Sequence, residues 1–393
     1  MRTQVGIIGA GPAGLLLARL LSRQGIESVV LERRSASYVL GRVRAGVLER
    51  GTVALLEEAD CATRMRRESL PHDGFTINFD DRSLRIDLAD LTGSSVLIYG
   101  QTEMTRDLMS AREAEGGVTL YEAEVQGISD IDSERPRIHF RQNDREASIE
   151  CDYVAGCDGF HGVSRTHIPS AILQTFERTY PFAWLGVLAD VPPCSEELVY
   201  ASHADGFALA SMRSRTRSRY YIQCAADTRI EHWPDNRFWE EFERRAGPAT
   251  ARHVTRGPSI EKSLAPLRSF VAEPMRHGRL FLAGDAAHIV PPTGAKGLNL
   301  ATSDVGLLAR ALAAFYKAAR SDLFDTYSAR CLARVWKAER FSWWMTSLLH
   351  RFPETDAFAR RLQRAEFDYL SGSRAAQTAL AENYVGLALP PTA

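Results

Sequence analysis

Long hydrophobic runs, an excess of one charge and paired cysteines are all missing from this chain of 393 residues. No apolar run approaches the length of a membrane-spanning helix, so we expect no membrane partner. Lysine plus arginine number 48 against 49 for aspartate plus glutamate, and this balance gives no general attraction to nucleic acid. Because the chain enters an apolar strand by Thr3, it leaves no room for a signal peptide, and we expect a cytoplasmic protein.

Cysteine is scarce, and its spacing excludes the common metal motifs. The six cysteines include no CxxC pair and no cluster with histidine. We therefore expect reduced, mostly buried thiols and no metal site. A composition of 45% hydrophobic and 25% charged residues is that of an ordinary globular protein, and the length suggests two or three domains.

A dinucleotide-binding fingerprint stands at the N-terminus. Thr3–Ile8 is predicted to form a strand, and Gly9-x-Gly11-x-x-Gly14 opens an apolar helix. A second predicted strand follows and ends at Glu32. The glycines permit a tight turn and the close approach of a pyrophosphate, while Glu32 can hold a ribose hydroxyl. The motif alone is weak, but this order of strand, turn, helix, strand and acid predicts a bound dinucleotide.

Two later motifs favour a flavoprotein over a simple NAD dehydrogenase. Leu280–Ala283 is predicted to be a buried strand that ends in Gly284-Asp285, before a Pro-Pro-Thr-Gly turn and a helix start near Gly297. Such a turn and helix N-terminus favour an anion or an electron-rich ring, with Asp285 accepting hydrogen bonds from hydroxyls. Asp158-Gly159 follows another apolar strand; in isolation this dipeptide is usually an ordinary turn. Together the three motifs resemble those of FAD-dependent aromatic hydroxylases that also use NAD(P)H.

The chain is expected to have a mixed α/β architecture (α+β mixed). We predict a Rossmann-like FAD-binding domain with an inserted β-sheet substrate domain and a helical C-terminal region. The interior of the insertion is expected to be rich in strands, beginning with Trp184–Ala189. The predicted boundaries are 1–70, 101–180 and 276–350 for the FAD-binding domain, 71–100 and 181–275 for the substrate domain, and 351–393 for the C-terminal region, a candidate dimer interface.

The insertion contains an arginine-rich run, Ser211–Tyr221. A solvated hairpin or a nucleic-acid patch would be ordinary explanations. The neutral chain and the lack of a second run of similar density argue against nucleic acid. A turn near Arg215–Arg217 would place Ser211, Arg213 and Tyr221 on paired strands, where an inward Arg213 offers a planar fork for a carboxylate.

Long segments of the chain resemble the p-hydroxybenzoate hydroxylase family of single-component FAD monooxygenases over essentially the whole length. The resemblance implies hydroxylation of 4-hydroxybenzoate to 3,4-dihydroxybenzoate with NADPH and O2, through a flavin C4a-hydroperoxide, in a homodimer. The matching segments are Gly9–Gly14, Gly41–Glu49, Tyr99–Glu103, Ala155–Ser164, Arg217–Tyr221, Arg279–Leu300, Lys337–Trp344 and Glu382–Gly386.

The resemblance also implies roles for individual residues. For the substrate, Ser211, Arg213 and Tyr221 would hold the carboxylate, Tyr200 and the Pro292 carbonyl would face the ring, and Tyr384 and His72 would relay the phenol proton to solvent. For FAD, the implied residues are Gly9, Gly11, Ala13, Gly14, Glu32, Arg42, Val43, Arg44, Ala45, Gly46, Val47, Gln101, Asp158, Asp285, Leu298 and Asn299. For NADPH they are Arg33, Arg34, Tyr38, Arg44, His161 and Arg268.

Several alternatives stay open on the sequence alone. Without the resemblance, Tyr200 and Tyr384 would be read as ordinary buried tyrosines and His72 as a surface histidine in a loop. Two positions depart from the family pattern: Ala13 stands where serine is common, and Arg34 where glutamine is. Competing functions are a dehydrogenase without oxygen chemistry, a nucleic-acid-binding module, or a related hydroxylase of another hydroxybenzoate or an aminobenzoate.

Overall fold

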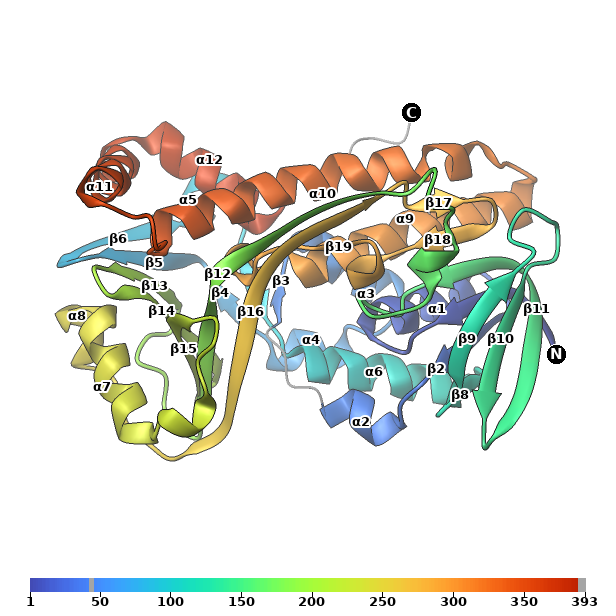
Figure 1. The fold of residues 1–393 in the computed structure, drawn as a ribbon, viewed down its shortest axis with the longest axis horizontal. Helices are drawn as coiled ribbons and strands as arrows, with labels where there is room; N and C mark the ends of the chain where they lie inside the picture. Colours follow the sequence, from blue (N-terminus) through green and yellow to red (C-terminus); the bar gives the residue numbers. More distant parts are fainter. Residues whose placement is uncertain (42–45, 388–393) are drawn as a thin grey trace.

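Three β-sheets organise the chain, and Figure 1 shows the two larger ones toward opposite ends of an elongated molecule. The computed structural model describes residues 1–41 and 46–387. One eight-stranded sheet lies near the N-terminus and a second lies at the other end, while the long helix α10 (Asp322–Leu349) runs past both. The expected mixed α/β class is confirmed.

The N-terminal sheet has parallel strands at its centre, in the order β17-β18-β11-β1-β2-β8. Ile8 of β1 is level with Gly156 of β11, which is level with Leu282 of β18. The strands therefore end at the same edge, and the three glycine-rich turns follow there. The bounds are β1 Arg2–Ile8, β2 Ser28–Glu32, β8 Thr119–Tyr121, β9 Glu124–Ser129, β10 Arg137–Gln142, β11 Arg145–Gly156, β17 Arg276–His277 and β18 Leu280–Leu282.

Apolar helices bury this sheet. The helix α1 (Pro12–Arg23) packs against α6 (Gln101–Ala114) and α9 (Gly297–Ala318), as its run of buried leucines predicts. Both the helix at Gln101 and the helix start at Gly297 were predicted. The shorter helices of this part are α2 Ala36–Gly41, α3 Arg50–Glu58 and α4 Thr63–Glu68.

Helix α9 corrects one expectation. It is long and apolar enough, by length and composition alone, to cross a membrane. However, 72% of its most apolar window is buried inside the protein. A core helix passes the same test, because burial against protein and burial in lipid both select apolar side chains.

The second large sheet has two different faces. Its order is β19-β16-β12-β15-β14-β13-β5-β6. One face packs under the helix α7 (Asp235–Ala246), and the other packs against α10, α11 and α12. The bounds are β5 Gly74–Phe79, β6 Arg82–Asp87, β12 Gln174–Ala189, β13 Leu198–His203, β14 Gly206–Ser214, β15 Arg217–Ala225, β16 Ser259–Glu273, β19 His288–Ile289, α5 Leu88–Thr92, α8 Pro248–Ala251, α11 Ala357–Gly372 and α12 Arg374–Val385.

A third, small sheet has the spatial order β3-β7-β4, with β3 Val47–Leu48, β7 Val96–Ile98 and β4 Leu70–His72. All its pairs are antiparallel. The strand β7 therefore lies between the segment after residue 46 and the strand that carries His72.

The strand-rich prediction for 181–275 missed the helices α7 and α8. Phe238, Trp239 and Phe242 are buried on one side of α7, at the spacing that an amphipathic helix requires. The strand β12 also begins at Gln174, earlier than the predicted Trp184. Its first residues are mostly exposed, so pairing with β16 defines this part of the strand, and hydrophobic alternation does not reveal it.

Replacement of Phe238 tests how far the α7 face supports this sheet. Phe238→Ala removes a fully buried ring, and we expect the free energy of unfolding to fall by about 3–5 kcal/mol. Ile172→Ala is the control, because that side chain is 45% exposed in a turn and its loss should change stability by less than about 0.5 kcal/mol. Denaturant unfolding measures both variants. Equal effects of the two replacements would contradict the assignment of α7 to the core.

Candidate active site

In the first glycine motif, a side chain would clash with the backbone at two of the three glycines and would meet free space at the third. A Cβ on Gly9, which has a positive φ of 105°, would lie 2.4 Å from the Cys157 carbonyl oxygen. A Cβ on Gly14 would lie 2.0 Å from the Gly9 carbonyl oxygen, so helix and turn meet in backbone contact. At Gly11 a Cβ would meet no atom within 4 Å. Open space at the second glycine fits a pyrophosphate that approaches the backbone.

Glu32, the acidic residue of this motif, is fixed by hydrogen bonds from two backbone amides. One oxygen of Glu32 accepts a hydrogen bond from the Ala10 amide and the other from the Arg34 amide, both at 2.9 Å. The carboxylate is thus fixed at the strand end beside the open turn, and its remaining lone pairs suit ribose hydroxyls. Half-buried Ala13 adds no polar atom, so backbone amides would contact the pyrophosphate here.

Asp158 stabilises a loop at the same edge of the sheet. Its Oδ2 accepts hydrogen bonds from both the amide and the hydroxyl of Ser164, each at 2.9 Å. Its Oδ1 is buried and has no partner among the described residues. Burial raises the pKa of this carboxyl group, and the bonds from Ser164 oppose the shift. The structure therefore gives Asp158 a loop-closing role that is compatible with the predicted contact to FAD.

The Gly284-Asp285 turn is held from behind by helix α9. Gly284 has a positive φ of 62°, and its amide donates to Asp304 Oδ2 at 3.0 Å. The same oxygen lies 2.6 Å from His288 Nε2, and both side chains are buried. Asp285 is half-buried on the short 3-10 turn Gly284–Ala286. This fixed turn places Asp285 at the strand edge where the other two motifs end.

The N-terminus of α9 offers backbone amides. The first amides of a helix have no acceptor within it, and here these include Leu298 and Asn299. The Asn299 side chain is fully used by the protein: Oδ1 accepts from the Glu49 amide and Thr52 hydroxyl, and Nδ2 donates to two carbonyls. A flavin contact of Asn299 would therefore use its main chain.

Part of the predicted FAD set is placed and part is not described. Arg42, Val43, Arg44 and Ala45 lie outside the described residues. A Cβ on Gly46 would lie 1.7 Å from the Tyr99 carbonyl oxygen, and the Tyr99 amide donates to the Gly46 carbonyl at 3.0 Å. Gly46 and Val47 are thus brought beside Gln101 at the start of α6.

The candidate substrate residues share one face of the second sheet. Tyr200 on β13 is opposite Leu209 on β14, which is opposite Tyr221 on β15. Side chains of directly opposite residues lie on the same face. Gly186 completes the row, because a Cβ there would lie 2.7 Å from the Tyr221 ring. Ser211 follows Leu209 by two positions and so continues the same side of β14.

Arg213 lacks an internal partner for its charge. Its Nε and Nη1 atoms are buried without a hydrogen-bond partner among the described residues. Burial lowers the pKa of this guanidinium, opposed first by Tyr221. In contrast, Arg219 pairs with Glu261 at 2.8 Å, and Arg217 pairs with Asp190 at 2.6 Å. A buried cation without a partner is costly, so the Arg213 position suits a bound carboxylate.

Two buried tyrosines meet at the other part of this face. The Tyr200 and Tyr384 hydroxyl oxygens lie 2.7 Å apart, and both rings are almost completely buried. Phe75 contacts both rings, stacking on Tyr384 at 4.2 Å. Burial raises the pKa of both phenols. The structure therefore joins, by a direct hydrogen bond, two residues that are far apart in the sequence.

His72 is buried, so the ordinary alternative of a surface histidine in a loop is wrong. It ends the strand β4, and only 1% of the residue is exposed. Neither ring nitrogen has a hydrogen-bond partner within residues 1–41 and 46–387. Burial lowers its pKa to about 4, which favours the neutral ring at neutral pH. No hydrogen bond joins it to either tyrosine in this described part of the chain, so the predicted relay lacks one link here.

The Pro292 turn lies next to this face. Pro292–Gly294 forms a 3-10 turn whose Pro292 carbonyl accepts a hydrogen bond from the Ala295 amide at 3.0 Å. Ala295 packs against the same apolar cluster as Tyr200 and Tyr221. The turn that precedes α9 thus also borders the face that carries the candidate substrate residues.

The predicted NADPH residues form two separate groups. Arg33 and Arg34 are exposed, and the Arg34 guanidinium lies 5.1 Å from the centre of the exposed Tyr38 ring. His161 and Arg268 both contact the Phe160 ring, at 5.0 and 4.5 Å from its centre. Arg268 also pairs with Glu177 at 3.2 Å. No contact joins the two groups among the described residues.

The residue types in the sequence did not predict a buried network of ion pairs around Glu49. Lys296 Nζ lies 2.7 Å from Glu49 Oε1 and 2.9 Å from the Tyr384 carbonyl oxygen. Arg334 donates to the other Glu49 oxygen at 2.7 Å. Burial lowers the pKa of Lys296, and Glu49 opposes the shift. The network ties the backbone at Tyr384 to the residue before α9, and nothing in the sequence spacing signals it.

Comparison with known proteins identifies the class. A family profile described as FAD binding domain matches residues 2–342. The crystal structure of p-nitrophenol 4-monooxygenase PnpA from Pseudomonas putida superposes with a TM-score of 0.83, at 20% identity, over 98% of this chain and 99% of that one. The chain belongs to the FAD-dependent aromatic hydroxylase family.

Individual relatives narrow the class further. The chain is 55% identical over 388 residues to p-hydroxybenzoate hydroxylase of Acinetobacter baylyi, covering 98% of this chain and 96% of the relative. It is 27% identical to a protein of Rhodococcus jostii described as "Probable NADH-specific resorcinol 4-hydroxylase", over 83% of this chain. In that case the match spans 61% of the relative's length.

Gly11 tests the position of the pyrophosphate. Because Gly11→Ala meets no protein atom, the apoprotein should keep wild-type stability while FAD affinity falls at least about tenfold through contact with the pyrophosphate. Gly14→Ala is the matched variant, because its Cβ strikes backbone and should destabilise the apoprotein as well. Flavin fluorescence titration and denaturant unfolding separate the two effects. Normal FAD binding by Gly11→Ala would place the cofactor elsewhere.

Proposed function

We propose that this protein is an FAD-dependent monooxygenase that hydroxylates 4-hydroxybenzoate to 3,4-dihydroxybenzoate with NADPH and O2. The observation that carries the proposal is a sheet face with two features: Tyr200, whose hydroxyl is hydrogen-bonded to that of Tyr384 on α12, and nearby Arg213, whose buried Nε and Nη1 have no partner among the described residues. A ligand with a carboxylate at one end and a phenol at the other matches both. The identity of 55% to p-hydroxybenzoate hydroxylase supports the same choice.

Arg213 anchors the substrate in this proposal. A guanidinium can bind a carboxylate through two parallel hydrogen bonds, and the Ser211 and Tyr221 hydroxyls can add further bonds. Gly186 lacks a Cβ, and this allows the Tyr221 ring to lie directly against the sheet. Holding the carboxylate fixes the distance of the ring from the Pro292 turn and from the start of α9.

Bound FAD would supply reducing equivalents from NADPH and an electrophilic oxygen for transfer to the ring. The residues that would hold it are the open Gly11 turn, Glu32, Asp285 and the first amides of α9. The buried aromatic side chains around Tyr200 exclude water from the place where the substrate ring lies. Exclusion of water limits the loss of reactive oxygen species without product.

The two tyrosines activate the substrate phenol. A phenolate ring is more nucleophilic than a phenol, yet with a pKa near 10 its ionisation at neutral pH costs roughly 4 kcal/mol. A hydrogen bond donated by the Tyr200 hydroxyl to the substrate oxygen stabilises the phenolate. Tyr384 orients Tyr200 through the bond of 2.7 Å. His72 then takes the proton toward solvent, after a rearrangement that joins it to the pair.

Arg213→Ala tests the carboxylate anchor. We expect the affinity for 4-hydroxybenzoate to weaken by about 2–5 kcal/mol, because a desolvated carboxylate loses its charged partner. Arg215→Ala, in the exposed hairpin turn, is the control and should bind normally. Isothermal titration calorimetry gives both affinities. Better turnover of 3-hydroxybenzoate by the wild-type enzyme, or normal binding by Arg213→Ala, would show that the pocket is wrongly assigned.

Tyr200→Phe separates binding from chemistry. The variant should retain FAD and substrate, but it should lose most hydroxylation, because nothing favours the phenolate. NADPH consumption should then produce hydrogen peroxide. Product measured by mass spectrometry, set against NADPH oxidised, gives the coupling. Fully coupled turnover in this variant would refute the role of Tyr200.

We also propose NADPH as the electron donor, bound on the surface at Arg33, Arg34 and Tyr38, with His161 and Arg268 toward the pyrophosphate. Family membership does not fix the donor, since the Rhodococcus jostii relative carries an NADH-specific description. Both Arg33 and Arg34 are exposed and have no acidic side-chain partner among the described residues, so they suit a dianionic 2′-phosphate.

Replacement of both arginines tests donor choice. Two charge-assisted contacts should favour NADPH over NADH by roughly 2–3 kcal/mol, so Arg33→Gln with Arg34→Gln should lose most of this preference. Steady-state kcat/KM with each donor measures it, and Arg145→Gln, on the exposed end of β11, serves as the control. Comparable kcat/KM for NADH in the wild-type enzyme would remove Arg33 and Arg34 from the donor site.

A cytoplasmic homodimer completes the proposal. The helix α11 exposes the apolar side chains Phe358, Leu362 and Tyr369, and such a cluster on a helix favours a protein partner. Sedimentation equilibrium of the purified protein checks the oligomeric state.

A further inference from the structure

One hollow in the described part of the chain lies away from the candidate active site. It encloses about 990 Å³ between the end of β15, the helix α7 and the loop after α10. None of the residues assigned above to substrate, FAD or NADPH lines it. Its volume is in the range of pockets that hold small molecules. It therefore needs an explanation of its own.

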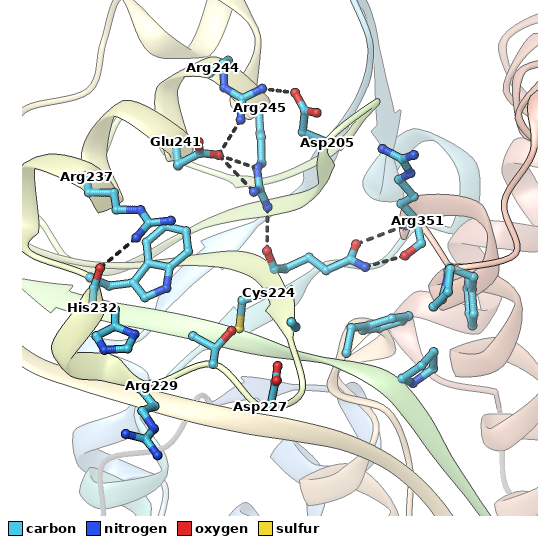
Figure 2. Close-up of a pocket in the computed structure, with 18 residues that line it drawn as sticks. Asp205, Cys224, Asp227, Arg229, His232, Arg237, Glu241, Arg244, Arg245 and Arg351 are labelled. Atoms are coloured by element: carbon cyan, nitrogen blue, oxygen red, sulfur yellow. Dashed lines mark hydrogen bonds and ion pairs between the residues drawn. The ribbon is translucent and has the colours of Figure 1, made fainter.

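Three exposed arginines border this hollow without a carboxylate partner in residues 1–41 and 46–387. Arg237 donates to a backbone carbonyl at 2.9 Å, and Arg351 donates to another at 2.8 Å. Arg229 lines the same hollow on the side opposite Arg351 (Figure 2). Their charges are thus available to a ligand.

The other charges of the lining largely cancel. Arg244 pairs with Asp205 and Glu241, and Arg245 pairs with Glu241 at 3.0 Å. Asp227 is the one lining carboxylate outside these pairs. Three guanidinium groups therefore stand against one carboxylate, in a chain whose net charge is −1. This local excess favours an anion.

Flat apolar walls accompany the positive charge. Half-buried Phe352 lines one part of the hollow, and it meets the buried Phe182 edge to face with ring centres 5.1 Å apart. Trp233 lies on the other side, with the Arg237 guanidinium 4.1 Å from its centre. A phosphate would use the arginines alone, whereas an aromatic carboxylate would use both the charge and the ring walls.

A chain of contacts connects the hollow to the face that carries the proposed substrate residues. Gln223 lines the hollow: its backbone carbonyl accepts a hydrogen bond from Arg245, and its side chain donates to the Arg351 carbonyl and accepts from the Arg351 amide. Gln223 follows Tyr221 by two positions on β15. His350, next to Arg351, accepts a hydrogen bond from Trp184 at 2.7 Å, and the Trp184 ring contacts Tyr221.

We propose that this hollow is a second binding site for an aromatic carboxylate of the same chemical class as the substrate. The carboxylate binds on the side of the hollow that carries Arg229 and Arg237, the ring packs against Trp233, and Arg351 on the opposite side adds to the positive potential. Because the arginines are exposed, this site binds more weakly than the buried Arg213 site. The choice of ligand rests on the proposed function, whereas the location rests on the charge and shape of the hollow.

Binding stoichiometry of 4-hydroxybenzoate to the holoenzyme tests the proposal. Equilibrium dialysis should find two molecules per chain for the wild-type protein, one bound tightly and one weakly. Arg229→Gln with Arg237→Gln should weaken the weak class at least about tenfold and leave the tight class unchanged. Arg213→Ala should do the reverse. Arg145→Gln, on the other large sheet, is the matched control and should retain both classes.

Each other outcome has a defined meaning. A tight class without a weak class in the wild-type protein, or a weak class unaffected by the paired replacement, overturns the second site. Equal displacement of the weak class by inorganic phosphate and by benzoate overturns the aromatic ligand and leaves a general anion site. A weak class without a tight class in the wild-type protein contradicts the proposed function. If the paired replacement abolishes that weak class, the binding site in the hollow is still supported.

Discussion

The parallel register of the N-terminal sheet is the constraint on which the rest of the structure depends. Leu31, Ile8, Gly156 and Leu282 are level across four strands, so three turns that are far apart in the sequence leave the sheet at one edge. A slip by one residue would reverse the side-chain faces and separate the turns. This alignment sets the positions of the turns that would hold FAD and of the helix α9, which starts beside them.

Much of this arrangement could be predicted, because it depends on the local spacing and type of residues in the sequence. The glycine motifs, the strand that ends at Glu32 and the helix that begins at Gly297 each follow from spacing and residue type. The pairing of β12 with β16 before Trp184 could not be predicted, because the exposed residues there show no alternation of hydrophobic and polar side chains. The aromatic side of α7 was also missed, because the surrounding strands favoured a uniform interpretation of 181–275.

Residue roles were harder to predict than elements. The run Ser211–Tyr221 contains several arginines, and only tertiary contacts distinguish them: Arg217 and Arg219 meet acidic partners, while Arg213 does not. The bond between Tyr200 and Tyr384 and the burial of His72 likewise depend on elements distant in the sequence. Long-range pairing of this kind leaves no periodic signal, so only the resemblance to a family suggested it.

The ion network at Lys296 has a consequence for the synthesis of this protein. Tyr384 lies on α12, the last helix of the described chain, yet its carbonyl is held by the residue that precedes α9. Because a chain emerges from the ribosome N-terminus first, the nucleotide sheet can form long before this contact exists. The N-terminal sheet is therefore able to align its glycine turns while the pair of tyrosines is still incomplete, and the bond between Tyr200 and Tyr384 forms only after α12 has been synthesised.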